Sequence, residues 1–295
     1  IYSISSLNRY RGVIVMDIDF SIEEVVKKRY SVRNYKDVEI ESEKINEIKV
    51  FIDSLDNPFG KEVDFHLFHM EDSNEKKKLG TYGVIKGAKN YIGTTIKLEP
   101  MTLEALGYEF EAVVLYLAHL GLGTCWLGGT FDRKGFARAM NIKEGELLPI
   151  ISPYGYAAEK KHIKELAMRK MIKADYRKNW NELFFMKDFN TPLSIEDAGD
   201  FAFPLEMVRL APSASNKQPW RVVVENNVLH FYEQKEPGYS DVFPYDIQRV
   251  DLGIAAAHFD FSVKQKGIKG QFKIESPSEI TLPKNIEYAF SWIKD

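Results

Sequence analysis

The chain has 295 residues, of which 44% are hydrophobic and 28% are charged, a balance that is typical of globular proteins and excludes bulk disorder. Its 40 basic and 43 acidic residues give a formal net charge of −3, which excludes the strong positive field of a general nucleic-acid-binding protein. No apolar run approaches the roughly 20 residues that span a bilayer, and a single cysteine excludes a disulfide framework. We therefore expect a cytoplasmic globular protein with one large domain or two ordinary ones.

The chain opens with residues 1–15, which lack the apolar core and cleavage pattern of a secretory signal. Because the regular pattern begins at Met16, we treat this stretch as an N-terminal extension that precedes the first half. The capping box Ser21-Ile-Glu-Glu24 predicts a helix that runs towards Arg29. Apolar residues at helical spacing predict a second helix over 45–55.

The middle of the chain predicts a core helix between strands. Residues 63–70 are expected to form a strand, and residues 103–120 a helix that is apolar around much of its circumference. Such a helix is usually central to a domain. A shorter helix over 133–140 and a strand over 147–152 follow. The basic stretch over 159–178 is expected to form a solvated helix or a linker.

The second half of the chain predicts a similar series of elements. Short strands over 220–225 and 228–232 flank Asn226-Asn227, and asparagine tolerates positive φ, so we expect a tight hairpin. The other expected elements are helices over 205–210, 250–266 and 285–294 and a strand over 270–275. The long apolar helices of both halves end at glycine, which is a weak signal of an internal duplication.

Residue types that carry metal or nucleophilic chemistry are poorly placed for it. His66 and His69 lie three apart in an expected strand and point to opposite faces, so we expect no metal site. Cys125 has no adjacent base and is expected to be an inert buried thiol. The segment around Gly128-Gly129 lacks the dinucleotide-binding spacing, so it either forms a tight connection or admits a flat ligand close to the backbone.

Two segments carry a more specific signal. In Arg29-Tyr-Ser-Val-Arg33 an extended backbone would place both arginines and Ser31 on one side, where they could bind one anion; the alternative is that both arginines are simply exposed. The loop Ala211-Pro-Ser-Ala-Ser-Asn-Lys-Gln-Pro-Trp220 contains two prolines and many short hydrogen-bonding side chains. This composition suits the polar edge of a flat heterocycle better than it suits a plain turn.

These segments resemble motifs of the FMN-dependent nitroreductase family. Arg29-Tyr-Ser-Val-Arg33 is similar to the family's Arg-Arg-Ser-x-Arg motif, with Tyr30 in place of the second arginine. The loop over 211–220 is similar to its Ala-Pro-Ser-x-x-Asn-x-Gln-Pro-Trp motif, and the segments over 121–129 and 155–160 are similar to two more. The resemblance extends unevenly from Phe20 to Gly270 and is strongest to the TM nitroreductase type, in which one chain carries both halves.

The order of these motifs departs from that of an ordinary family member. There the proline–serine motif follows the arginine motif closely, whereas here residues 54–60 stand in that place and the intact motif comes after residue 200. The resemblance therefore implies a single-chain pseudo-dimer with an α+β nitroreductase-like fold, in which two tandem halves with mixed or antiparallel sheets and flanking helices are related by a pseudo-two-fold. We assign residues 16–175 to the first half and 176–295 to the second, and expect a monomer with one shared flavin site.

The resemblance also implies which residues bind the cofactor. The arginine motif would bind the phosphate and the polar side of the flavin, the loop of the second half would contact the ring and ribityl chain, and the segment around Gly128 would supply backbone near the redox edge. An arginine after the basic stretch would bind phosphate. The expected cofactor-binding residues are Arg29, Tyr30, Ser31, Arg33, Leu127, Gly128, Gly129, Arg177, Pro212, Ser213, Ala214, Asn216 and Gln218.

The activity that the resemblance implies is that of an FMN-dependent oxidoreductase, which passes electrons from NAD(P)H to nitroaromatic, quinone or similar flat small molecules. Because the flavin carries the redox chemistry, no catalytic side chain is assigned. Two alternatives stay open, namely a flavin-binding protein without turnover and another flavin reaction on the same fold, such as reductive dehalogenation. Neither a nucleic acid nor a membrane is expected as a partner.

Overall fold

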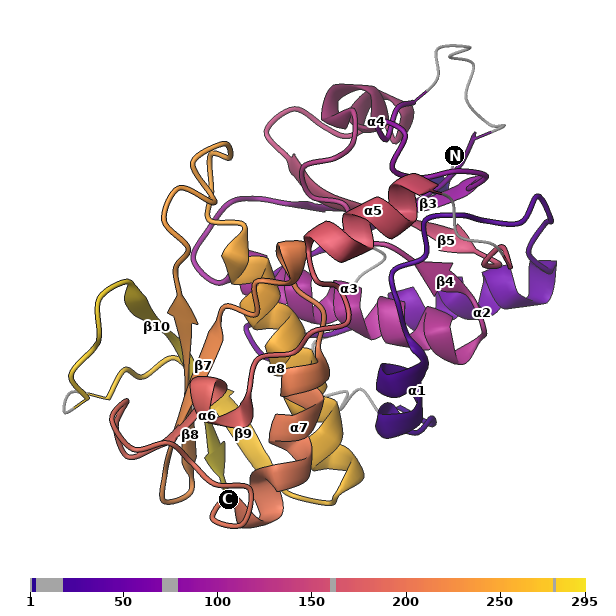
Figure 1. Cartoon of the computed structure of the whole chain (residues 1–295). Coiled ribbons are helices and arrows are strands. Elements are labelled where there is room, and N and C mark those ends of the chain that lie inside the picture. Colours follow the sequence, from indigo (N-terminus) through magenta and orange to yellow (C-terminus); the bar gives the residue numbers. More distant parts are fainter. Residues whose placement is uncertain (1, 4–17, 71–78, 160–162, 278–279) are drawn as a thin grey trace. The chain divides into compact units, whose positions relative to one another are not determined.

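The computed structural model describes residues 2–3, 18–70, 79–159, 163–277 and 280–295 (Figure 1). The extension expected over residues 1–15 thus lies almost wholly outside the described residues, as do Lys160 and Lys161 of the basic stretch. The chain divides into two compact units. Unit 1 comprises Ile1–Phe20, Lys28–Thr102 and Glu109–Ala174, and unit 2 comprises Ser21–Lys27, Leu103–Tyr108 and Asp175–Asp295.

Unit 1 contains a five-stranded sheet within the described residues. Its strands are β1 (Tyr2–Ser3), β2 (Asp64–His69), β3 (Asn90–Ile96), β4 (Gly123–Thr124) and β5 (Leu147–Gly155), hydrogen-bonded in the order β1-β2-β3-β5-β4. All of its neighbouring pairs are antiparallel. The sequence pattern does not predict β3, because all seven of its residues are buried and it lacks the polar–apolar alternation of a half-exposed strand.

Helices cover both faces of this sheet. On one face Phe65 packs on Phe110 of α3 (Thr102–His119), with ring centroids 6.0 Å apart. On the other face Tyr91 packs on Phe136 of α4 (Arg133–Ala139) at 5.1 Å. The other helices of the described part of unit 1 are α2 (Ser42–Asp53) and α5 (Ile163–Met171). The helices expected over 45–55, 103–120 and 133–140 are therefore confirmed.

Unit 2 contains a second five-stranded sheet among its described residues. Its strands are β6 (Phe184–Met186), β7 (Trp220–Glu225), β8 (Val228–Gln234), β9 (Gly270–Lys273) and β10 (Ile286–Lys294), in the order β6-β7-β8-β10-β9. β6 runs parallel to β7, and the other pairs are antiparallel. The hairpin expected at Asn226-Asn227 is confirmed, and Asn226 has the expected positive φ of 53°.

The helix expected over 285–294 is wrong, because this segment forms β10. The strand lies between β8 and β9 and pairs with both. A register shift between Tyr288 and Phe290 inserts one residue into the ladder. That bulge interrupts the alternation of a strand, so that the apolar residues Ile286, Phe290 and Ile293 recur at a spacing that resembles a helix.

The long helix α8 (Gln248–Gln265) forms the centre of unit 2. Every residue from Val250 to Val263 is buried, which fits a helix surrounded by other elements. Phe259 of α8 lies 5.5 Å from Phe231 of β8 and packs the helix onto the sheet. The other helices here are α1 (Ile22–Lys28), α6 (Trp180–Leu183) and α7 (Ala202–Leu210). Among the described residues, no helix combines the length and apolar character needed to cross a bilayer.

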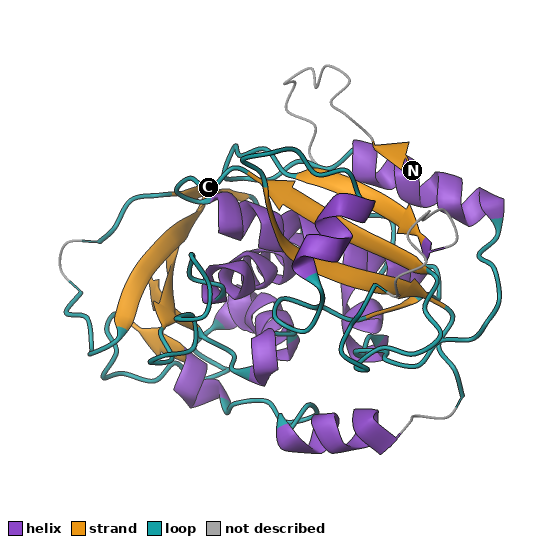
Figure 2. Cartoon of the chain, turned by 90° about the horizontal axis from the view of Figure 1, so that it is seen from above, coloured by secondary structure: helices purple, strands orange, loops and turns teal. Residues whose placement is uncertain are grey.

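The two units repeat one topology, although their sequences differ. In each sheet the strands are arranged as first, second, third, fifth and fourth in chain order. A long helix separates the third strand from the fourth in both cases, α3 in unit 1 and α8 in unit 2. The strands of both sheets are orange in Figure 2. This repetition bears out the expected α+β fold built from two tandem halves.

Candidate functional site

The arginine motif of unit 1 forms an extended segment beside β4. The Val32 amide donates a hydrogen bond of 2.8 Å to the Thr124 carbonyl, and Ser31 pairs with Thr124 as a parallel bridge. Gly123 makes this close approach possible, because a Cβ at this position would lie 2.4 Å from Val32 Cγ2. Ser31 is half-buried, whereas Tyr30 remains 40% exposed.

Arg33 is the most informative residue of this segment. Its side chain is only 6% exposed, and its Nε and Nη1 atoms are fully buried with no hydrogen-bond partner among the described residues. Burying a charged donor without an acceptor is costly, so such a group calls for a partner such as a water, an ion or a ligand. Arg33 also lines a cavity of about 310 Å³ in unit 1. The remaining lining residues are Tyr82, Gly83, Val84, Ala167, Met168 and Met171.

Arg29 and Arg33 both influence the buried thiol of Cys125. Burial raises the pKa of the Cys125 thiol, and the two arginines oppose that rise, Arg33 more strongly than Arg29. Burial lowers the pKa of Arg29 itself, and the nearby carboxylate of Glu111 opposes this change. Glu111 is fixed in turn by the indole of Trp126, whose Nε1 donates to Glu111 Oε2 at 3.0 Å. Both arginines therefore contribute positive potential around Cys125.

In the segment from Leu127 to Gly129, the first residue is fixed by backbone hydrogen bonds and the two glycines have unbonded amides. Leu127 is buried, and it exchanges two hydrogen bonds with Ile151, at 2.9 and 3.1 Å. The Gly128 carbonyl accepts from Arg133 Nη2 at 2.5 Å. The amides of Gly128 and Gly129 make no hydrogen bond to the described residues, which leaves these two N–H groups available to a ligand.

The proline–serine loop of unit 2 connects α7 to β7. Three of its residues, Ser215, Asn216 and Gln218, have positive φ, between 48° and 57°. The Ser213 hydroxyl accepts from the Gln218 amide at 2.8 Å and closes the loop on itself. The Ala214 amide donates to Asp251 Oδ1 of α8 at 3.0 Å. The loop is thus held in one shape by its own polar groups, while Pro212 and Ala214 stay half-buried.

Arg177, Asn216 and Gln218 lie close together in unit 2 and share hydrogen bonds with one another and with the backbone. Arg177 donates to the Leu210 carbonyl from Nε and Nη2, and from Nη1 to Asn216 Oδ1 at 3.3 Å. The Asn216 amide group donates to the Tyr176 carbonyl at 2.9 Å. Gln218 is completely buried, and its Oε1 accepts from the Lys178 amide at 2.8 Å. These contacts attach the loop to residues 176–178.

Unit 1 has a different loop at the corresponding position, between α2 and β2. Its Asn57 is buried and donates from Nδ2 to the Lys61 carbonyl at 2.7 Å and to Glu109 Oε1 at 2.6 Å. The Asn57 side-chain oxygen Oδ1 accepts from the backbone amides of Phe59 and Lys61. Where unit 2 carries the intact motif, unit 1 thus carries a loop folded around one asparagine.

Replacing Asn57 by alanine should lower the free energy of unfolding by about 1–3 kcal/mol, because the buried Glu109 carboxylate and the loop amides lose their shared partner. Urea unfolding monitored by circular dichroism measures this loss. At neutral pH Asn57→Asp should lower the free energy of unfolding more than Asn57→Ala does, because it places a second carboxylate beside Glu109. Equal stability of wild type and Asn57→Ala would contradict this role.

The cavity wall is the part of the candidate site that the sequence does not reveal. Tyr82, Gly83 and Val84 belong to no recognisable motif, and α5 lies in the stretch interpreted as a solvated helix or linker. The apolar spacing of Met168 and Met171 was the available signal, although lysines and arginines surround them. Among the described residues, no three His, Cys, Asp or Glu side chains are grouped so as to hold a metal ion.

Comparison with known proteins identifies similar chains. The family model described as "Putative TM nitroreductase" matches residues 21–263. The crystal structure of a nitroreductase from Thermotoga maritima MSB8, also described as putative, is 19% identical in sequence; the match covers 98% of this chain and 99% of that one, with a TM-score of 0.59, and shows the shared fold. Comparison with curated proteins returns no match.

Shorter flavoproteins match about half of the chain. An FMN-dependent nitroreductase from Clostridium difficile R20291 is 23% identical over 50% of this chain and 95% of its own, with a TM-score of 0.39. A nitroreductase with bound FMN from Bacteroides fragilis NCTC 9343 is 19% identical over 50% of this chain and 93% of its own, also with a TM-score of 0.39.

Proposed function

Because this chain belongs to the Putative TM nitroreductase family, whose model matches residues 21–263, we propose that it is an FMN-dependent oxidoreductase that passes electrons from NAD(P)H to nitroaromatic, quinone or similar flat acceptors. The observations that carry this proposal are that Arg33 lines the cavity of unit 1 and that two donor atoms of its guanidinium are buried and unpaired among the described residues. The motif resemblance supplies the identity of the ligand.

The residues of unit 1 fit a flavin in charge and in surface character. FMN offers carbonyl and phosphate oxygens, and a guanidinium donates to such acceptors with charge-assisted hydrogen bonds. The apolar part of the wall, formed by Val84, Ala167, Met168 and Met171, suits a flat aromatic body. Arg29 adds a second positive charge near Arg33, and the open amides of Gly128 and Gly129 offer further donors.

The loop of unit 2 supports the proposal through its rigidity. Ser213, Asn216 and Gln218 are engaged in hydrogen bonds that fix the backbone, so a flavin would meet a preformed main chain and not a mobile one. We propose that this loop and the arginine motif serve the same flavin, as the motif resemblance implies, with one flavin per chain. The chain would then act as a monomer, which sedimentation can test.

The protein has a limited part in the chemistry. When bound, the flavin would accept a hydride from the nicotinamide and pass it to the acceptor, whose further protons would come from water, so no catalytic side chain is assigned. The arginines hold the cofactor and offset the negative charge of its phosphate and of its reduced form. The apolar cavity wall excludes water from the bound ring.

The first test is the visible spectrum of the purified chain with added FMN. Uptake of one FMN per chain, its bleaching by NADH or NADPH, and its reoxidation by a quinone or nitroaromatic are the expected results. Failure to take up FMN would refute the proposal, and two FMN per chain would refute the single shared site. Binding without reduction would favour a flavin-binding protein without turnover, and product analysis with halogenated aromatics would detect reductive dehalogenation.

Replacing Arg33 by glutamine should weaken FMN binding roughly 10- to 100-fold, because a charge-assisted hydrogen bond is worth about 1.5–3 kcal/mol. Fluorescence titration of FMN measures the dissociation constant. Arg138→Gln is the matched control, since Arg138 is an exposed arginine of the same unit, and it should leave the affinity unchanged. Asn57→Ala should also leave FMN affinity unchanged. An Arg33→Gln chain that binds FMN like wild type would remove the main support for the site.

A further inference from the structure

Tyr82 has a strained backbone and lies at the mouth of the cavity in unit 1. It lines the cavity and is nevertheless 71% exposed, so it stands where the cavity meets solvent. Its φ is 48°, in the left-handed region that bulky side chains rarely adopt. Among the described residues, no other aromatic residue has a positive φ. Because strain of this kind clusters at active sites and ligand-binding sites, the conformation of Tyr82 calls for a functional reason.

The turn that carries Tyr82 is fixed by backbone hydrogen bonds. The Val84 amide donates to the Thr81 carbonyl at 2.8 Å and closes the turn around Tyr82. Directly after the turn, the Lys86 amide donates to the Arg33 carbonyl at 2.9 Å. This second bond attaches the turn to the arginine motif. The backbone of Tyr82 is therefore held at a defined place relative to the backbone of Arg33.

The residues that line the cavity differ in exposure and in chemistry. Arg33 and Val84 are buried, and Met168 is half-buried and packs on the hydrophobic core of unit 1. Met171, at the end of α5, is 75% exposed, as Tyr82 is. The buried end thus offers the N–H donors of Arg33, whereas the exposed end offers a phenol ring and a thioether. Both of these groups make favourable contacts with flat aromatic rings.

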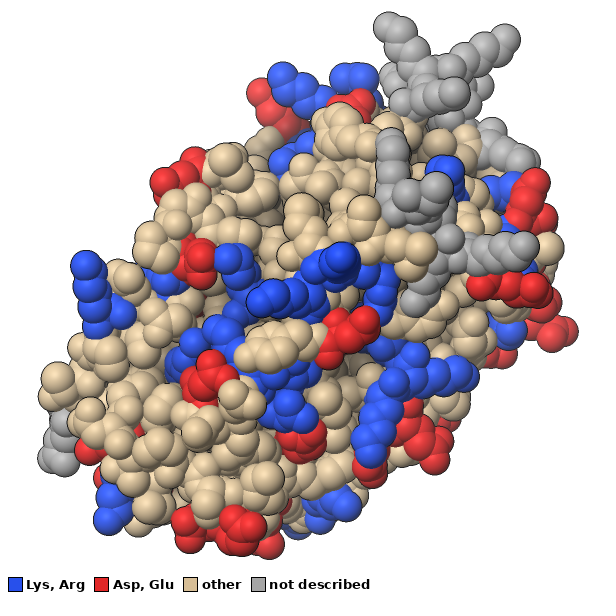
Figure 3. All heavy atoms as spheres, in the orientation of Figure 1, with Lys and Arg blue, Asp and Glu red and all other residues tan. Residues whose placement is uncertain are grey.

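The end of α5 that carries Met171 is positively charged. Arg169 and Lys170 form its last turn together with Met171. Figure 3 shows lysine and arginine side chains gathered over the segment that follows α5. Such a surface attracts anionic small molecules. A flat aromatic ring that carries a negative charge therefore fits the mouth of the cavity in both surface character and charge.

We propose that Tyr82 is an acceptor-binding residue, whose ring stacks on a flat aromatic acceptor at the mouth of the cavity and selects aromatic over aliphatic acceptors. Met171 is the second contact of this acceptor. The identification rests on the proposed function, in which the donors of Arg33 at the buried end serve the flavin and the exposed end remains for the acceptor. The left-handed backbone of Tyr82 is then explained by the position that it gives to the ring.

Binding of para-nitrobenzoate to the full chain, with FMN added and no nicotinamide present, tests this role without turnover. Isothermal titration measures the dissociation constant. Tyr82→Gly should weaken binding about 3- to 10-fold, the effect of losing one aromatic contact, whereas Tyr82→Phe should change it less than twofold. Cyclohexanecarboxylate has the same charge and no aromatic ring, so Tyr82→Gly should leave its weaker binding unchanged. No binding of para-nitrobenzoate by wild type, equal binding by wild type and Tyr82→Gly, or equal weakening for both ligands would overturn the proposal.

Urea unfolding separates this role from a structural one. Tyr82→Gly relieves the left-handed backbone, so its unfolding midpoint should be at least as high as that of wild type although the ligand binds less tightly. If this variant fails to fold, Tyr82→Asn decides, because asparagine tolerates positive φ.

Asn141→Gly is the matched control for the change in backbone. Asn141 also has a positive φ, of 54°, in unit 1, but it does not line the cavity, so this substitution should leave the affinity for para-nitrobenzoate unchanged. A chain that takes up FMN and reduces acceptors equally well with Tyr82→Gly would refute this role and leave the proposed function intact. A chain that binds para-nitrobenzoate through Tyr82 but takes up no FMN would refute the proposed function and leave the aromatic site intact.

Discussion

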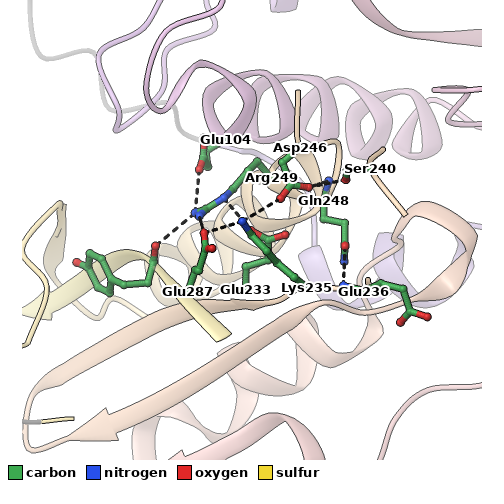
Figure 4. A network of polar contacts seen from close by, with 10 residues as sticks. Glu104, Glu233, Lys235, Glu236, Ser240, Asp246, Gln248, Arg249 and Glu287 are labelled. Atoms are coloured by element: carbon green, nitrogen blue, oxygen red, sulfur yellow. Dashed lines mark hydrogen bonds and ion pairs between the residues drawn. The ribbon is translucent and has the colours of Figure 1, made fainter. Parts of the chain in front are cut away.

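At pH 9, replacing Arg249 by methionine should lower the free energy of unfolding by about 3–5 kcal/mol, the usual cost of leaving a buried carboxylate without its cation. Arg249 of α8 is the centre of the ion-pair network in Figure 4. Its Nε lies 2.8 Å from Glu233 Oε2, its Nη2 3.2 Å from Glu287 Oε2, and its Nη1 3.5 Å from Glu104 Oε1. Glu233 is completely buried and Glu104 nearly so, so water cannot replace the lost charge.

This destabilisation should grow with pH. Burial raises the pKa of Glu233 to about 8, against the opposing effect of Arg249. The folded state therefore binds a proton at Glu233 between about pH 5 and 8 that the unfolded state does not, and the contribution of this group to stability falls as pH rises through that interval. Near pH 6 Glu233 is largely neutral with or without Arg249, whereas at pH 9 the loss of Arg249 either leaves a buried anion or forces Glu233 to take up a proton, and both lower stability.

Urea unfolding at pH 6 and pH 9 measures both effects. Lys294→Met is the matched control, because Lys294 pairs with Asp200 at 3.0 Å in a solvent-exposed position, and such pairs contribute about 1 kcal/mol at most. The double variant Arg249→Met, Glu233→Gln should recover part of the loss at pH 9. A loss below 1 kcal/mol at both pH values would mean that the network contributes little to stability.

Replacing Gly253 by alanine should lower the free energy of unfolding by about 1–3 kcal/mol, although alanine raises helix propensity by about 1 kcal/mol. A Cβ at Gly253 would lie 2.0 Å from the Glu104 carbonyl oxygen, and one at Gly107 would lie 2.1 Å from the Val250 carbonyl oxygen. Within unit 2, α8 and the first turns of α3 therefore touch backbone to backbone. A methyl group at this crossing must separate the two helices.

The reciprocal glycine provides the control for this prediction. Gly107→Ala should lower the free energy of unfolding by a similar amount. The loss in the double variant should be clearly smaller than the sum of the two single losses, because either methyl group alone already separates the helices. Thermal and urea unfolding of the three variants test this. Fully additive losses would show that the glycines act at independent sites.

The parts of the fold that follow from local sequence are those with strong local signals. The hairpin at Asn226-Asn227 depends on residues that tolerate positive φ, and α3 and α8 depend on long apolar runs. The strands β3 and β10 depend instead on their neighbours in the sheet. β3 is buried along its whole length and β10 carries a bulge, so neither shows a period of two that the sequence alone could reveal.

The candidate site also has one part that the sequence identifies and one part that only the fold brings together. The arginine motif and the proline–serine loop are contiguous, so their composition and family resemblance identify them. The cavity wall combines Tyr82–Val84 with α5, two segments far apart in sequence, and only the fold brings them to Arg33. The roles of single side chains are also hidden in the sequence. The family resemblance implies that Arg177 binds phosphate, and the structure adds that its guanidinium donates hydrogen bonds to the backbone carbonyls of Leu210 and Tyr176.

The division of α3 between the two units affects how the chain can fold during synthesis. Unit 2 includes Leu103–Tyr108, yet β10, which joins β8 to β9 in its sheet, ends at Lys294. At usual translation rates the roughly 190 residues in between take about 10–40 s to synthesise. Phe261 of α8, on which the Tyr108 ring packs, is made roughly 150 residues after Tyr108, so for most of that time this ring lacks its partner. The same arrangement means that a gene cut after residue 174 would separate unit 2 from two of its three chain segments.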